Sequence, residues 1–67
     1  MTVAKVIEVI ASGGSYESAI EAGVTQVSST VDNIESVWVQ DHSLQVADGS
    51  VTEHRVHLKV TFIVAGS

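Results

Sequence analysis

The sequence contains no cysteine and no proline. Without cysteine, neither a disulfide nor a thiolate-bound metal can stabilise this small chain. Association with other chains is the remaining common way to stabilise a fold of this size. A chain of about 60 residues buries only about 60% of its unfolded surface, whereas 45% of these 67 residues are hydrophobic. We therefore predict a single domain, residues 1–67, that covers part of its apolar surface with copies of itself.

Basic residues are also scarce, since three Lys and Arg stand against eight Asp and Glu, for a formal net charge of −5. A protein that binds the phosphate backbone needs a surface rich in lysine and arginine, so we expect no nucleic-acid partner. No apolar run in the sequence approaches the ~20 residues needed to cross a bilayer. We therefore expect a soluble, cytoplasmic protein with no membrane partner.

Patterns typical of catalytic sites are missing as well. The sequence has no nucleophile elbow, no paired carboxylates and no phosphate-binding loop, and Gly13-Gly14 lacks the spacing of a nucleotide-binding fingerprint. We therefore expect that the protein is not an enzyme.

The order of hydrophobic patterns predicts a β-α-β-β protein. Residues 2–10 are rich in β-branched side chains, which favours a first strand. Ser12-Gly13-Gly14-Ser15 then ends the strand and starts a helix, for which Ser12 and Ser15 are both candidate N-caps. An apolar stripe predicts that this helix extends to Asp32-Asn33. The stripe consists of Tyr16, Ile20, Gly23, Val24, Val27 and Val31.

Two further strands, residues 34–46 and 51–64, are expected to form a hairpin around Ala47-Asp48-Gly49-Ser50, because Asp-Gly is a strong two-residue turn signal. A plain turn sets the register and puts one polar row on a single face. In that row Trp38 lies opposite Lys59, Gln40 opposite His57, and His42 opposite Arg55.

The other face of the hairpin is expected to pack on the helix. Its apolar residues are Val37, Val39, Val56, Leu58, Val60, Phe62 and Val64. The fold class is therefore α+β, a three-stranded antiparallel sheet half-wrapped around one amphipathic helix.

Near the hairpin tip the apolar residues change sides, because Leu44, Val46 and Val51 fall on the face of Trp38. Either the hairpin twists or a β-bulge resets its register. In both cases we expect a neighbouring subunit to cover these side chains.

Three segments carry a resemblance that spans essentially the whole chain: VIEVIASGGS in the first strand and turn, STVDNIESVWV at the helix end and second strand, and EHRVHLKVTF in the third strand. Together they are similar to the dodecin family. The resemblance implies a β-α-β-β subunit assembled as a hollow shell of twelve copies, a homododecamer. It also implies binding of a flavin, riboflavin or FMN, in pairs between stacked tryptophans near two-subunit contacts.

The resemblance places the flavin site on the second and third strands. The stacking tryptophan of flavin-binding dodecins corresponds to Ser36, and Trp38 lies two residues further on the same strand face. The glutamine that hydrogen-bonds the flavin corresponds to Arg55. We take Trp38, Arg55, Ser36, His57 and Gln40 as the candidate ligand-binding residues, with Trp38 as an aromatic platform.

Other roles stay open for these residues. Trp38 is equally suited to a subunit contact, where tryptophan is enriched, and Arg55 to a salt bridge with an acid. His54 and His57 are three apart on a strand, so they point to opposite faces and cannot bind one metal ion together. His42 is expected on the face of His57 and Arg55.

The expected function is a non-enzymatic shell that binds and sequesters a flavin at subunit interfaces. The alternative is a flavin-free shell with a structural or divalent-cation role. A branch of the dodecin family described as binding calcium carries arginine at the position of Arg55 and lacks the stacking tryptophan. In such a shell, calcium or magnesium would bind acids such as Asp41, Asp48 and Glu53, gathered from several chains at a symmetry axis.

Overall fold

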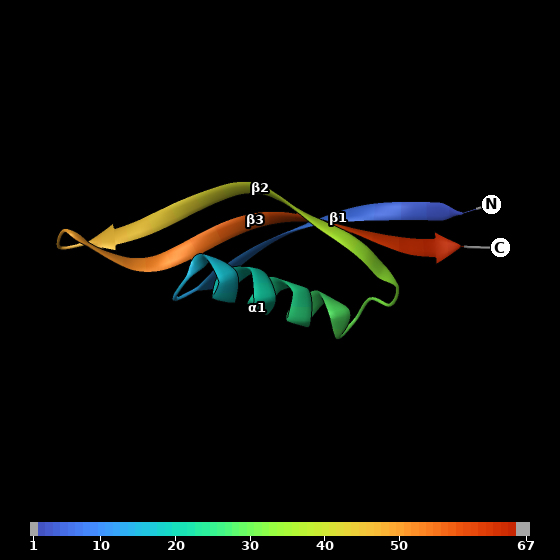
Figure 1. Ribbon diagram of the computed structural model, residues 1–67, viewed down its shortest axis with the longest axis horizontal. Helices are drawn as coiled ribbons and strands as arrows, with labels where there is room; N and C mark the ends of the chain where they lie inside the picture. The colour runs from blue at the N-terminus through green and yellow to red at the C-terminus, as the bar shows by residue number, and fades with distance from the viewer. Residues whose placement is uncertain (1, 66–67) are drawn as a thin grey trace.

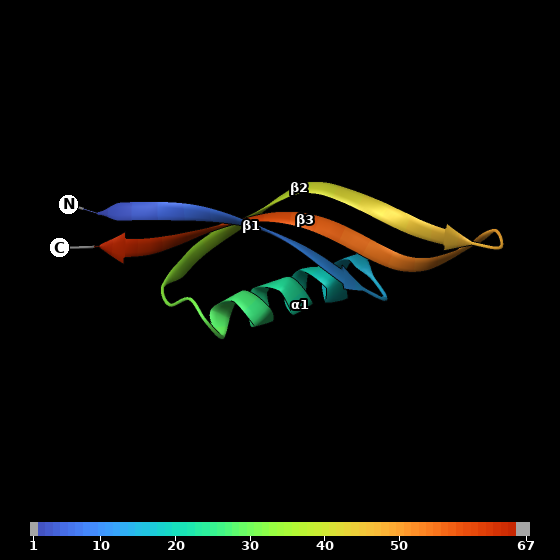
Figure 2. The ribbon, with the colours of Figure 1, turned by 180° about the vertical axis from the view of Figure 1, so that it is seen from behind.

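The computed structural model describes residues 2–65, which form one helix and three strands (Figure 1). In chain order these are β1 (Val3–Gly13), α1 (Tyr16–Ser28), β2 (Ile34–Ala47) and β3 (Ser50–Ala65). β3 is the central strand and pairs antiparallel with both neighbours, in the order β1-β3-β2. α1 lies against one face of the sheet (Figures 1 and 2). The predicted β-α-β-β topology and the α+β class are confirmed.

β1 is longer than the sequence pattern predicted. We expected it to end at Ile10, but it continues to Gly13, because Ser12 and Gly13 still pair with Arg55 and His54 of β3. Pairing with a long central strand therefore outweighs the local preference of serine and glycine for a turn.

Ser15 is the N-cap of α1, which decides between the two candidate serines. Its Oγ accepts a hydrogen bond from the Ser18 amide at 3.1 Å, and Ser18 Oγ accepts one from the Ser15 amide at 2.9 Å. These two bonds form a capping box, in which two of the free amides at the helix start are satisfied reciprocally. The acidic side chain of Glu17 lies in the same first turn, where it interacts favourably with the helix dipole.

α1 ends at Ser28, earlier than the predicted end at Asp32-Asn33. Beyond it, Ser29 Oγ donates a hydrogen bond of 2.6 Å to the Gln26 carbonyl. Serine side chains compete with the backbone for such carbonyls, which favours the end of a helix. Asn33 does adopt the left-handed conformation (φ 61°), but there it leads into β2, where its carbonyl accepts the Ile63 amide at 3.0 Å.

The core lies between α1 and the sheet and is small. The buried hydrophobic side chains of the described residues are Ala19, Val27, Val56, Leu58 and Val60. Gly23 is buried where α1 passes over the sheet, since a Cβ there would lie 2.7 Å from Leu58 Cδ1 and 3.1 Å from Ala11 Cβ. A side chain at this position would force the helix away from the sheet. The predicted core face of the hairpin is confirmed for Val37, Val39, Val56, Leu58 and Val60. The prediction was wrong for Val64, which is exposed because it lies near the end of β3, where the pairing with β1 is irregular.

The pairing of β2 with β3 shifts register at three places, between Ile34 and Ser36, between Val39 and Asp41, and between Gln45 and Val46. The second of these is a β-bulge at Gln40. Trp38 lies opposite Lys59, as predicted, whereas His57 lies opposite Asp41 instead of Gln40. Gln40 is therefore the extra residue of the bulge. Of the two alternatives for the inverted apolar pattern, a twist or a bulge, the bulge is the one that the structure contains.

The bulge moves the following residues of β2 to the other face of the sheet. His42 lies opposite Val56 of the core row rather than opposite Arg55. The predicted pairs of Gln40 with His57 and of His42 with Arg55 are therefore wrong, as is the shared face of His42 and His57. The error arose because a plain turn fixes one register for a whole hairpin, and the bulge breaks it.

The hairpin tip extends beyond α1 (Figure 1). The register places Leu44, Val46 and Val51 on the same side of the sheet as α1, and not on the face of Trp38 as expected. These three side chains remain exposed. No element of the described chain covers the hydrophobic tip.

The molecule is elongated for its length. It measures 53 × 19 × 13 Å along its principal axes and has a radius of gyration of 14.0 Å, compared with about 11 Å for a compact domain of this size. No helix in residues 2–65 has the length and apolar character that a bilayer span requires.

Replacing Ser15 by alanine should lower the free energy of unfolding by about 1 kcal/mol, because the N-cap hydroxyl is lost. The matched variant Ser12→Ala, in β1, should change it by less than about 0.5 kcal/mol. Urea unfolding followed by circular dichroism, at equal protein concentrations, measures both. Equal losses in the two variants would contradict the assignment of Ser15 as the cap.

Candidate functional site

The face of the sheet turned away from α1, named the open face here, carries most of the predicted site residues. Glu8 of β1, Lys59 of β3 and Trp38 of β2 are neighbours in register across the three strands. Ser36 and His57 lie on the same face, because each is two residues from a member of this row. The alternation of strand side chains thus assembles the site.

Trp38 presents a largely uncovered aromatic ring. Its neighbours Val37 and Val39 pack against the core, so Trp38 must point to the open face. The side chain is 62% exposed, and the Lys59 ammonium lies 5.1 Å from the ring centroid. This distance is within the range of a cation–π interaction, which orients the indole on the strand.

Glu8 lies close to both His57 and Lys59 beside this ring. Its Oε1 lies 3.6 Å from His57 Nε2 and 3.9 Å from Lys59 Nζ. Sequence reasoning missed Glu8, because only the β2–β3 register could be estimated from a turn. The antiparallel pairing of β1 with β3, which brings Glu8 opposite Lys59, has no short connection to reveal it.

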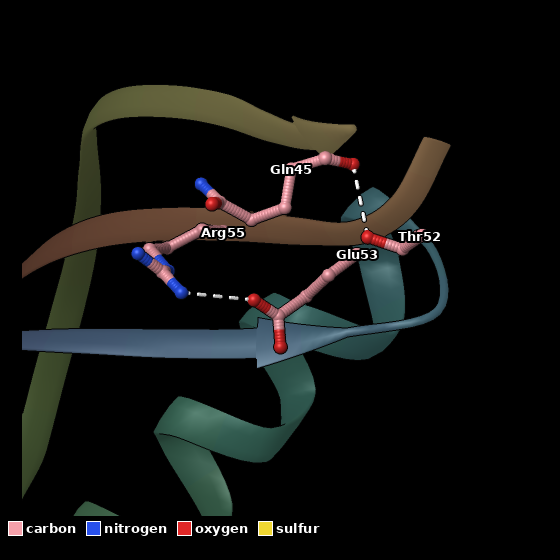
Figure 3. A network of polar contacts seen from close by, with 4 residues as sticks. All are labelled: Gln45, Thr52, Glu53 and Arg55. Carbon is pink, nitrogen blue, oxygen red and sulfur yellow. Dashed lines mark hydrogen bonds and ion pairs between the residues drawn. The ribbon is translucent and has the colours of Figure 1, made fainter. Parts of the chain in front are cut away.

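Arg55 forms an ion pair within its own strand. Its Nη2 lies 3.0 Å from Oε2 of Glu53, and Figure 3 shows these two side chains meeting on β3. The nearby Thr52 hydroxyl donates to the Gln45 carbonyl at 3.2 Å, which ties the same end of the hairpin together (Figure 3).

Arg55 is distant from Trp38 within one chain. Arg55 is four positions along β3 from Lys59, the partner of Trp38, which corresponds to about 13 Å along the strand. Trp38, Lys59, His57 and Glu8 are therefore brought together, and Arg55 lies apart from them.

Gln40 occupies the bulge and has no partner residue in the β2–β3 register. It is exposed and directly follows Val39 in the chain. Its structural effect is to bend β2 and to change the side on which later residues lie.

The three histidines separate into two places. His57 is on the open face, whereas His42 and His54 meet on the α1 side, with His42 Nε2 3.0 Å from His54 Nδ1. The prediction that His54 and His57 point to opposite faces is confirmed. Within residues 2–65, no group of three or more His, Cys, Asp and Glu side chains is placed to hold a metal ion.

The open face is also unusually apolar for a solvent-facing sheet. Val6 and Ile10 flank Glu8 on β1, and they are 56% and 67% exposed. A separate groove of 280 Å³ between the helix end and β3 contains none of the predicted site residues. It is lined by Thr30, Val31, Asp32, Asn33, Phe62, Ile63 and Val64.

Several solved structures share this fold. A dodecin variant from Thermus thermophilus superposes with a TM-score of 0.92 at 22% identity, covering 98% of this chain and all of that one, which shows the fold alone. A dodecin from Streptomyces coelicolor has a TM-score of 0.91 at 27% identity, with 98% and 96% covered.

A calcium dodecin from Mycobacterium tuberculosis, described as calcium-chelating with a novel calcium-binding site, has a TM-score of 0.81 at 30% identity. The similarity covers 97% of this chain and 94% of that one. No curated protein sequence matches this chain.

The family model for dodecins matches residues 3–65, which include every strand and the helix. The three-stranded sheet, the single helix on one face and the long hairpin agree with that match. The chain therefore belongs to the dodecin family.

Proposed function

We propose that this protein assembles into a hollow shell of twelve copies and sequesters a flavin, riboflavin or FMN, against Trp38 at contacts between subunits. The observation that carries the proposal is the indole of Trp38, 62% exposed on the open face with the Lys59 ammonium 5.1 Å from its centroid. An exposed tryptophan on a sheet face is a suitable platform for a planar ligand, because aromatic rings prefer offset stacking.

Assembly is supported by the surface that one chain leaves uncovered. Val6, Ile10 and Trp38 on the open face are each more than half exposed, and so is Val46 at the hairpin tip. A soluble monomer rarely exposes so many large apolar side chains in contiguous patches. Copies of the chain provide the simplest cover, and the elongated shape allows one subunit to reach several neighbours.

The polar groups near Trp38 suit the edge of a flavin ring. A flavin presents carbonyl and N–H groups along one edge, which His57, Ser36 and Gln40 can meet with donors and acceptors. Lys59 adds positive charge that favours the phosphate of FMN. Arg55 lies about 13 Å along β3, so it would contact a ligand bound to the Trp38 of a neighbouring copy.

The proposed role is binding without chemistry. Around Trp38 the described residues provide no nucleophile with an adjacent base, and Glu8 is engaged with His57 and Lys59. Stacking and burial would shield a light-sensitive or reactive cofactor from solvent, which is the function of a storage protein.

A second candidate is a shell that binds calcium or magnesium. The 30% identity to a calcium-chelating dodecin favours it. Because residues 2–65 contain no single-chain group of three or more metal-binding side chains, the acids Asp41, Asp48 and Glu53 would have to be collected from several copies around a symmetry axis.

The assembly is tested by sedimentation. Twelve chains of 7.0 kDa give a particle of about 84 kDa, and sedimentation equilibrium at micromolar concentration should return this mass. A folded, stable species of 7 kDa under the same conditions would contradict the shell and with it the interfacial site.

The flavin site is tested by titrating riboflavin and following the quenching of its fluorescence. Trp38→Ala should weaken binding at least about fivefold, because stacking on an aromatic side chain contributes about 1–3 kcal/mol. The matched control is Tyr16→Ala, which removes an exposed aromatic ring on the other side of the sheet and should leave affinity unchanged.

Particle mass separates the roles of Trp38. Loss of binding with the mass retained supports a ligand platform, whereas dissociation of the particle would identify Trp38 as a subunit contact only. A wild-type protein that fails to quench riboflavin, yet unfolds at a higher temperature with calcium, would replace the flavin proposal with the cation-binding one.

A further inference from the structure

We propose that His42 and His54 form a binding site for a transition-metal cation, of the class of Zn²⁺, Cu²⁺ and Ni²⁺. The observation that carries the proposal is the 3.0 Å separation between His42 Nε2 and His54 Nδ1. The pair lies on the α1 side of the sheet, so it is independent of the flavin proposal on the open face.

The bulge at Gln40 creates this pair. It places His42 opposite Val56 and Leu44 opposite His54, so the two histidines are diagonal neighbours on adjacent strands. Side chains of diagonal neighbours on one face are within reach of each other when they are long. In the register without a bulge, the two imidazoles would point to opposite faces of the sheet.

The start of α1 closes one side of the pair. The ring centroid of Tyr16 lies 4.6 Å from that of His42. The imidazole planes of His42 and His54 are inclined by 22°, and their centroids are 5.3 Å apart. The phenol ring therefore limits the rotation of His42. His42 remains exposed on its other side, which leaves a path for an ion.

The spacing of the two nitrogens suits a metal ion. Tetrahedral zinc with Zn–N bonds of 2.0–2.1 Å separates two ligating nitrogens by about 3.3 Å, a few tenths of an ångström more than the present distance. Without metal, one nitrogen must carry the proton shared between them. With metal, each ring can remain neutral with its proton on the far nitrogen, Nδ1 of His42 and Nε2 of His54.

The donor set selects the class of cation. Imidazole nitrogens favour zinc, copper and nickel, whereas calcium and magnesium require several oxygen ligands. Since residues 2–65 contain no group of three or more metal-binding side chains, one chain supplies two ligands here and water completes the coordination. The formal charge of −5 raises the local concentration of cations of either class.

Calorimetric titration of the untagged protein with CuCl₂ and with ZnCl₂ tests the site. We expect saturable binding of one ion per chain, and a copper electron paramagnetic resonance spectrum with hyperfine coupling to two nitrogens. His42→Gln and His54→Gln should each weaken the affinity at least about tenfold, because even outer partners of metal ligands contribute 10–100-fold. His57→Gln, on the open face, is the matched control and should bind as the wild type does.

Retention of binding in both His42→Gln and His54→Gln, or an equal loss in His57→Gln, would overturn the proposal, as would the absence of saturable binding to the wild type. Circular dichroism checks that each variant is folded. Trp38→Ala should bind copper with the affinity of the wild type. The flavin proposal and the metal proposal can therefore be contradicted separately.

Discussion

The close approach of α1 to the sheet at Gly23 determines how much of this chain can be buried. A Cβ at Gly23 would meet both Leu58 and Ala11, so the helix packs directly on β1 and β3. Yet the 13 residues of α1 extend only about 20 Å, whereas the 16 residues of β3 extend about 50 Å. One short helix therefore covers less than half the length of one face, and within residues 2–65 no element covers the other face (Figure 1). Our proposal that further subunits cover this surface rests on this difference in length rather than on any single exposed residue.

The open face combines the two properties that an interfacial binding site needs. Val6 and Ile10 provide apolar area that water disfavours, while Glu8, His57 and Lys59 form a connected group of polar and charged side chains beside the Trp38 ring. Apolar area drives association, and the group of polar and charged side chains fixes orientation and partner choice. A ligand buried between two such faces would stabilise the assembly by mass action, because it binds the associated state and not the separated chains. Ligand binding and shell stability are thus expected to rise together.

The sequence predicts the elements of this fold better than it predicts their register. Alternation along β3 identified Val56, Leu58 and Val60 as core, because a period of two is preserved from Glu53 to Thr61. The pattern also showed that Leu44 and Val46 conflict with Trp38, which signals a bulge or a twist. The pattern could not locate the extra residue of the bulge. An extra residue at any position between Trp38 and Leu44 would move Leu44 and Val46 off the face of Trp38. The structure places it at Gln40, and this choice depends on packing across strands. Glu8 was missed for a related reason, because β1 reaches β3 through a helix and no tight turn reports their alignment.

The bulge at Gln40 also explains how one hairpin can carry the two proposed sites on opposite faces of the sheet. Before it, β2 directs Trp38 to the open face; after it, the same strand directs His42 to the α1 side, next to His54. The separation is strict, because side chains on the two faces of a sheet cannot share a ligand. An ion bound to the histidine pair could affect binding at Trp38 only through the backbone of β2 and β3. It would do so by reducing the conformational freedom of the hairpin that carries both sites. Any such coupling must be reciprocal, so a planar ligand that orders β2 at Trp38 would strengthen ion binding to the same degree.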